Sequence, residues 1–152
     1  MAKERTWSAI GSRGNPCNGF LMSILFVPSR KQILICDFEY GRIEPSLGKV
    51  RRALVISPRS YNRRHGYEPG RCLVVPFTKT CPVDLAPAHV QFPADKYVSL
   101  SVPTWALCDC LRSVSHARLD RVNVAGVNYS EMISEEDMAR VDVGLRHAVG
   151  LA

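Results

Sequence analysis

The sequence has no apolar run long enough to cross a membrane. The longest one, from Ile24 to Val27, is stopped by Pro28, whereas a membrane-spanning helix needs about 20 apolar residues. No small-x-small cleavage site follows this stretch, so a secretory signal peptide is not expected. The P-loop and the G-x-G-x-x-G motif, which bind nucleotides in two common folds, are also absent. These absences point to a cytoplasmic protein that binds no nucleotide cofactor.

The chain also lacks the residue spacings of common metal sites. Its four histidines form no i, i+4 pair and its six cysteines form no C-x-x-C pair, although zinc sites generally use such spacings. Several cysteines lie inside apolar runs, where reduced and mostly buried thiols are expected. We therefore expect no metal ion and no other cofactor. The cysteines are Cys17, Cys36, Cys72, Cys81, Cys108 and Cys110.

The overall composition is that of an ordinary globular chain. Of its 152 residues, 46% are hydrophobic and 22% are charged, which fits one domain with a sizeable core. Residues 1–21 contain two glycine clusters and no sustained strand or helix period, so they are predicted to be a poorly ordered leader. Residues 22–152 then form the domain.

Short runs rich in branched and aromatic residues, each bounded by turn residues, predict β-strands. No helical stretch long enough for a crossover lies between these runs, so a set of βαβ units is not expected. Ten prolines and ten glycines interrupt the chain, which favours a mainly β fold with a small, strongly bent sheet or half-open barrel. The predicted strands cover residues 33–38, 52–57, 71–77, 89–92 and 105–114.

One helix is predicted at the end of the chain, over residues 135–149. Ser134 followed three residues later by Asp137 resembles a capping box. Apolar residues then recur at helical spacing, including Met138 and Val141, and Gly150 ends the pattern. This helix is expected to pack one face on the sheet.

The positive charge of the chain is concentrated in one segment. The formal net charge of the whole chain is +6, and the segment from Lys49 to Arg71 holds seven cations and one acidic residue, Glu68, which is also +6. Tyrosines interleaved with these arginines could stack on exposed bases while the guanidinium groups bind phosphates, so RNA is a candidate partner. A solvated loop is the alternative. The cations are Lys49, Arg51, Arg52, Arg59, Arg63, Arg64 and Arg71.

Three polar residues adjoin or interrupt apolar strand-like runs: Arg51, Thr78 and Asp109. Together, a carboxylate, an arginine and a hydroxyl would suffice for metal-free RNA cleavage. The carboxylate would take the proton of a ribose 2′-OH and the other two would hold the phosphate, leaving a 2′,3′-cyclic phosphate and a 5′-OH. Alternatively, Asp109 forms a structural salt bridge with a cation such as Arg51 or Arg112.

Five segments in register resemble the MazF/PemK toxins of type II toxin–antitoxin systems. The resemblance covers about residues 30–150 and follows the family's usual order. It implies an α+β fold, a small SH3-like barrel of the CcdB/MazF type with a C-terminal helix. The segments are Ile33–Phe38, Lys49–Pro58, Val74–Thr78, Trp105–Asp120 and the C-terminal helix.

The same resemblance implies a homodimeric, sequence-specific and metal-independent endoribonuclease that cleaves single-stranded RNA and is neutralised by a cognate antitoxin. Arg51 corresponds to the family's catalytic arginine, and Thr78 belongs to the same site. Asp109 matches the position of a proposed base in some members, and Glu44 is the other candidate base. The expected RNA-binding residues are Lys49, Arg52, Arg59, Arg63, Arg64, Lys79, Arg112 and Ser113.

The chain departs from the family pattern at several positions. Arg52 stands where the family often has proline, and Lys79 stands where a second hydroxyl often follows the first. Leu107 stands where some members carry a basic residue, and Glu44 lies seven residues before Arg51. The alternative function is a non-catalytic binding module on the same barrel, either an inactive regulator or a CcdB-like inhibitor of a protein target.

Overall fold

The computed structural model describes residues 24–38, 50–63 and 68–151. The predicted leader and the candidate residues Glu44, Lys49 and Arg64 lie outside the described residues. Within the described residues no helix has the length and apolarity to span a membrane. The elements in chain order are β1 (Ile33–Asp37), β2 (Val50–Val55), β3 (Arg71–Thr78), β4 (His89–Phe92), β5 (Thr104–Leu107), η1 (Cys108–Cys110), β6 (Arg112–Ser115), η2 (His116–Arg118), β7 (Leu119–Val124), β8 (Val127–Tyr129) and α1 (Glu135–Ala148).

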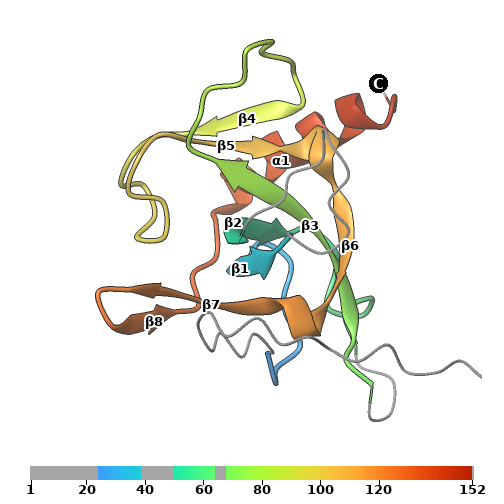
Figure 1. The fold of residues 1–152 in the computed structure, drawn as a ribbon. Helices are drawn as coiled ribbons and strands as arrows, with labels where there is room; N and C mark the ends of the chain where they lie inside the picture. Colours follow the sequence, from blue (N-terminus) through green and yellow to red (C-terminus); the bar gives the residue numbers. More distant parts are fainter. Residues whose placement is uncertain (1–23, 39–49, 64–67, 152) are drawn as a thin grey trace, which may run out of the picture.

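The strands form one antiparallel sheet with the order β4-β5-β3-β2-β1-β7-β8, and β6 also pairs with β3 (Figure 1). The mainly β fold with a C-terminal helix is therefore confirmed. The sheet formed by the described strands does not close on itself, so the word barrel applies only loosely. Strand β3 is the centre of this arrangement, because it pairs with β2 and with both β5 and β6.

The prediction of one strand over residues 105–114 is wrong. The structure divides this run into β5, the short 3-10 turn η1 and β6. The break occurs because β5 pairs with the end of β3 at Phe77 and Thr78, whereas β6 pairs with its beginning at Arg71–Val74. Strands β5 and β6 therefore pair with different parts of β3, and the turn η1 connects them.

The hairpin of β7 and β8 was not predicted from the sequence. Its two-residue turn has Ala125 at φ 50° and Gly126 at φ 84°, the left-handed region that a tight hairpin turn of this kind requires. A Cβ at Gly126 would meet nothing within 4 Å, so the backbone conformation alone favours glycine there.

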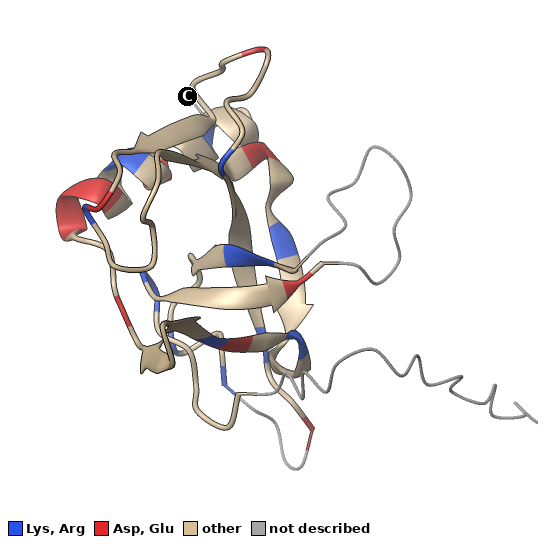
Figure 2. Ribbon diagram, turned by 60° about the vertical axis from the view of Figure 1, so that its left-hand side comes forward, with Lys and Arg blue, Asp and Glu red and all other residues tan. Residues whose placement is uncertain are grey.

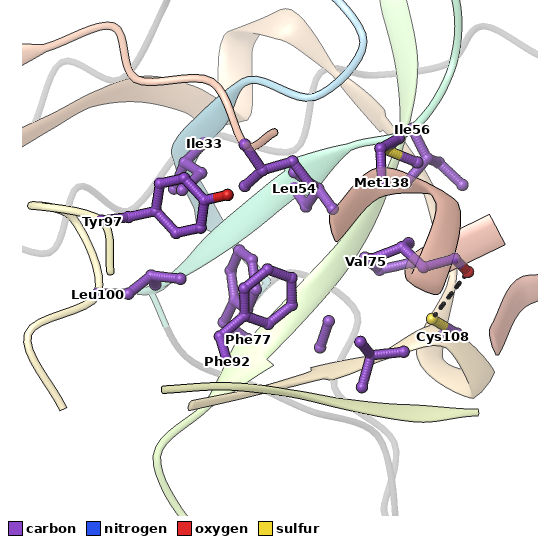
Figure 3. Close-up of a cluster of buried hydrophobic side chains, with 14 of the residues drawn as sticks. Ile33, Leu54, Ile56, Val75, Phe77, Phe92, Tyr97, Leu100, Cys108 and Met138 are labelled. Atoms are coloured by element: carbon purple, nitrogen blue, oxygen red, sulfur yellow. Dashed lines mark hydrogen bonds between the residues drawn. The ribbon is translucent and has the colours of Figure 1, made fainter. Parts of the chain in front are cut away.

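Alternate side chains of β1, β2 and β3 point to opposite faces of the sheet, and both faces are buried. One face carries Leu54, Val75 and Phe77 and is covered by α1 through Met138 and Val141 (Figure 3). The other face packs on β6 and β7 through a second apolar cluster. That second cluster includes Leu34, Cys36, Phe38, Ala53, Val55, Cys72, Val74, Val114 and Leu119.

Helix α1 begins one residue after Ser134 and ends one residue before the predicted end. The Ser134 side chain accepts a hydrogen bond from the backbone N–H of Asp137 at 3.2 Å. The Asp137 carboxylate is itself 1% exposed and accepts a hydrogen bond from the Tyr97 hydroxyl at 2.6 Å. It also pairs with Lys96 at 2.9 Å and Arg140 at 3.0 Å. The start of α1 is thus tied to the segment between β4 and β5.

Candidate functional site

Arg51 and Thr78 lie near the start of β2 and at the end of β3. The register of these strands pairs Ala53 with Pro76. Arg51 and Thr78 each lie two residues from this pair, on the same face of the sheet as its members. Both residues line one cavity of about 360 Å³, which we call the Arg51 cavity. Its lining is completed by Val50, Arg52, Phe77, Lys79, Thr80, Ser99, Leu100, Ser101, Val102 and Thr104.

Three residues that line the Arg51 cavity have a buried polar atom without a hydrogen-bond partner in the described part of the chain. The buried Nε atoms of Arg51 and Arg52 have no hydrogen-bond partner there, and neither has the buried hydroxyl of Ser99. Buried polar groups are normally paired. The Thr78 hydroxyl accepts a hydrogen bond from the Thr80 backbone N–H at 3.2 Å, which leaves its own hydrogen to donate. This set of donors suits an anion.

Two of the predicted RNA-binding residues, Arg52 and Lys79, also line the Arg51 cavity. Arg52 is partly buried and Lys79 is exposed. Because neighbouring residues of a strand point to opposite faces, Arg52 projects on the face that α1 covers, away from Arg51. The cavity is therefore bordered by cationic residues from both faces at this edge of the sheet.

Asp109 is held by a histidine. It lies in η1 with its side chain 49% exposed, and its Oδ2 is 3.1 Å from Nε2 of His89, whose side chain is 10% exposed. Nδ1 of His89 accepts a hydrogen bond from the Ala86 backbone N–H at 3.2 Å. The imidazole hydrogen is then on Nε2 and is donated to Asp109. Sequence reasoning expected Arg51 or Arg112 as the partner, and missed His89 because only the pairing of β4 with β5 brings it there.

Cys110 lies among the predicted catalytic residues. Burial and the adjacent Asp109, which hydrogen-bonds the thiol, raise the pKa of Cys110, while the positive charges of Arg112 and Arg51 act in the opposite direction. A thiol with a raised pKa is protonated near neutral pH, so Cys110 is not an activated nucleophile.

Arg112 and Ser113 line a second cavity of about 410 Å³, which we call the Arg71 cavity. Its lining residues are Asp37, Phe38, Arg71, Arg112, Ser113, Val114, Ser115 and Arg118. Nε of Arg71 donates to the Ser113 hydroxyl at 3.3 Å. The guanidinium of Arg112 lies over the Phe38 ring, 5.8 Å from its centroid.

The remaining predicted RNA-binding residues lie after β2. Arg59 and Arg63 are both exposed. Arg63 lines a third cavity with Tyr61 and Arg71. Within the described residues no group of three or more His, Cys, Asp or Glu side chains could hold a metal ion.

Comparisons with known proteins place the fold of this chain. A search of curated proteins finds no match. Among solved structures, MazF from Deinococcus radiodurans is similar with a TM-score of 0.61 and 24% identity, covering 82% of this chain and 98% of that one. An endoribonuclease in complex with its cognate antitoxin, from a mycobacterial species, has a TM-score of 0.58 and 20% identity, covering 82% and 97%. The MazE-MazF structure from Deinococcus radiodurans has a TM-score of 0.56 and 23% identity, covering 84% and 99%.

These similarities show the fold. The family model described as PemK-like, MazF-like toxin of type II toxin–antitoxin system matches residues 29–149. This match spans most of the 152 residues and includes every strand and the helix described above. The chain therefore belongs to the family of PemK-like and MazF-like toxins of type II toxin–antitoxin systems.

Proposed function

We propose that this chain is an endoribonuclease toxin that cleaves single-stranded RNA at specific sequences without a metal ion. The observation that carries the proposal is that Arg51 and Thr78 line one cavity together with Arg52 and Lys79, so that cationic and hydroxyl groups surround a space that a phosphate can enter. Family membership supports it, and so does the similar mycobacterial structure, which is named an endoribonuclease.

In the proposed reaction the 2′ oxygen of a ribose attacks the adjacent phosphorus. A carboxylate, either Asp109 or Glu44, takes the 2′ proton. Arg51 donates hydrogen bonds to the phosphate oxygens and stabilises the negative charge that develops on them, and the Thr78 hydroxyl donates to another of these oxygens. The bond to the 5′ oxygen breaks, and that oxygen takes a proton from water. The products are a 2′,3′-cyclic phosphate and a 5′-OH end.

The test is to incubate the purified full-length chain with a mixed-sequence RNA in EDTA and to map the cleaved ends. We expect cleavage at a repeated short motif with 5′-OH ends. Arg51→Ala should lower the cleavage rate on the order of 10²–10³-fold, because it removes donors to the developing charge. The cleavage rate of Arg51→Lys should lie between those of the wild type and Arg51→Ala, since lysine keeps the charge but lacks the planar guanidinium group.

Arg146→Ala is the matched control, because it also removes one positive charge but lies in the last turn of α1. Circular dichroism should show that all three variants are folded. Wild-type cleavage by Arg51→Ala would overturn the assigned mechanism. Absence of cleavage across many RNA sequences would instead favour the non-catalytic binding module.

We also propose that the toxin acts as a homodimer in the cytoplasm and is neutralised by a cognate antitoxin. The similar solved structures include two complexes with an antitoxin, one mycobacterial and one a MazE-MazF pair. Light scattering on the purified chain should give twice the mass of 16.9 kDa. If a small acidic protein is encoded beside this gene, adding it should abolish RNA cleavage.

A further inference from the structure

The Arg71 cavity is lined by more positively than negatively charged side chains. Three arginines line it, Arg71, Arg112 and Arg118, against one aspartate, Asp37, which gives a net charge of +2. Four consecutive residues of β6 line it as well. Because successive residues of a strand alternate between faces, the cavity runs along this strand rather than over one face.

Arg112 of the Arg71 cavity lies on the same face of the sheet as Arg51, whereas Arg71 and Ser113 lie on the opposite face. Arg112 pairs with Val74 in the register of β6 with β3, and Thr78 lies four residues further along the same strand, so Arg112, Thr78 and Arg51 project from one face. Cys36 is buried and is paired with Arg51 in the register of β1 and β2. Burial raises the pKa of the Cys36 thiol to about 12, and the charges of Arg118 and Arg112 act against that rise.

The chemistry of the Arg71 cavity suits a phosphate group. Arg71 uses its Nε in the bond to Ser113, which fixes the guanidinium plane and leaves the terminal nitrogens to form a bidentate contact. Arg112 is positioned by the Phe38 ring beneath it. The hydroxyls of Ser113 and Ser115 add short donors along the same strand.

We propose that the Arg71 cavity binds a backbone phosphate of the RNA strand next to the scissile one, with Arg71 and Arg112 as its ligands. This subsite rests on the proposed function, since it holds the strand whose cleavage the Arg51 cavity performs. An RNA strand fits better than an acidic peptide for two reasons. Phosphates recur along it at short, regular intervals, and Arg71 also lines the third cavity, where the exposed Tyr61 offers a surface on which a base can stack.

The test measures binding of the full-length chain to a 2′-O-methyl RNA that contains the mapped cleavage motif. The 2′-O-methyl groups prevent cleavage and keep the phosphates. A methylphosphonate placed at one position at a time removes the charge of one phosphate. For the wild type we expect affinity to fall roughly 5- to 10-fold at the scissile phosphate and at one flanking phosphate.

Arg71→Ala should weaken binding of the unmodified strand roughly 5- to 10-fold, and its affinity should no longer respond to the methylphosphonate at that flanking position. It should still respond at the scissile phosphate. Arg146→Ala, which removes the same charge from α1, should bind like the wild type at every position. Thermal unfolding of each variant checks that the fold is kept.

Two outcomes would overturn the subsite while leaving the proposed function intact. In the first, the wild type cleaves RNA, but Arg71→Ala responds to every methylphosphonate as the wild type does. In the second, Arg71→Ala leaves RNA affinity unchanged and weakens binding of a polyglutamate peptide, which would assign the cavity to an acidic protein partner. A wild type that neither cleaves nor binds any RNA would instead overturn the proposed function itself.

Discussion

At the scale of single residues, substitutions of His89 test whether this histidine orients the Asp109 carboxylate or only lies near it. If Asp109 is the base, removing the His89 donor should lower the cleavage rate about tenfold, because the carboxylate loses its fixed orientation. His89→Gln places an amide N–H near the position of Nε2 and should retain most of the activity, whereas His89→Ala should not. The rate is measured in single-turnover cleavage at saturating enzyme.

The comparison of the two variants is the control for this pair, because an amide N–H at the position of Nε2 would not restore a rate lost through general damage to the fold. An equal rate loss in His89→Gln and His89→Ala would show that the histidine only supports the fold.

Residues of the candidate site differ in how far the sequence could place them. Arg51 and Thr78 lie where apolar strands begin and end, so their place on one face of the sheet follows from strand boundaries and antiparallel pairing. The partner of Asp109 could not be predicted, because His89 comes from another strand and only the register of β4 with β5 brings it close. The meeting of Arg71 with Ser113, 42 residues apart, depends on β3 pairing with β6. The roles of all these residues stay predictions.

At the scale of elements, local signals were sufficient for α1 but not for β5 and β6. Helix capping acts over a few residues, and Ser134 caps the helix as the sequence indicates. The apolar run from residue 105 to 114 shows no local sign of its break, because both halves are apolar and both pair with the same strand, β3. The position of the break depends on which part of β3 each half pairs with, and the hydrophobic periodicity of the sequence does not specify that pairing.

The anchoring of α1 through Asp137 predicts a specific loss of stability in acid. Burial raises the pKa of this carboxyl, but hydrogen bonds from Tyr97, Lys96 and Arg140 outweigh it, so the pKa is lowered from its ordinary 3.8. A lowered folded-state pKa means that the stabilisation is present above about pH 4 and is lost as the pH falls through the folded-state value. Asp137→Asn should cost about 2 kcal/mol at pH 7.

Urea unfolding at pH 7 and at pH 3 checks this prediction. The difference in unfolding free energy between wild type and Asp137→Asn should shrink at the lower pH, because the wild-type carboxylate is then progressively protonated. Tyr97→Phe removes the hydrogen bond to Asp137 and the one that the Tyr97 hydroxyl accepts from the Ser134 backbone N–H at 2.8 Å, and it should cost about 2 kcal/mol at pH 7. A difference between wild type and Asp137→Asn that stays constant over this range would contradict the charged form as the anchor.

At the scale of the whole molecule, the distribution of charge predicts how RNA affinity depends on salt concentration. Basic residues lie along the sheet, while the first turn of α1 is acidic (Figure 2). The formal net charge of +6 equals that of the segment from Lys49 to Arg71, so the rest of the chain is balanced. Binding of RNA should therefore depend on a few local phosphate contacts rather than on a diffuse positive surface.

The salt dependence of RNA affinity tests this view. Each phosphate contact to a single strand contributes about −0.7 to the slope of log K against log salt. Two phosphates, the scissile one at Arg51 and the flanking one at Arg71 and Arg112, give a slope of about −1.4, or an affinity loss of roughly 7-fold between 50 and 200 mM salt. Arg71→Ala should make the slope shallower by about 0.7, and Arg146→Ala should leave it unchanged. An equal change in both variants would mean that net charge, not the geometry of the cavities, determines the affinity.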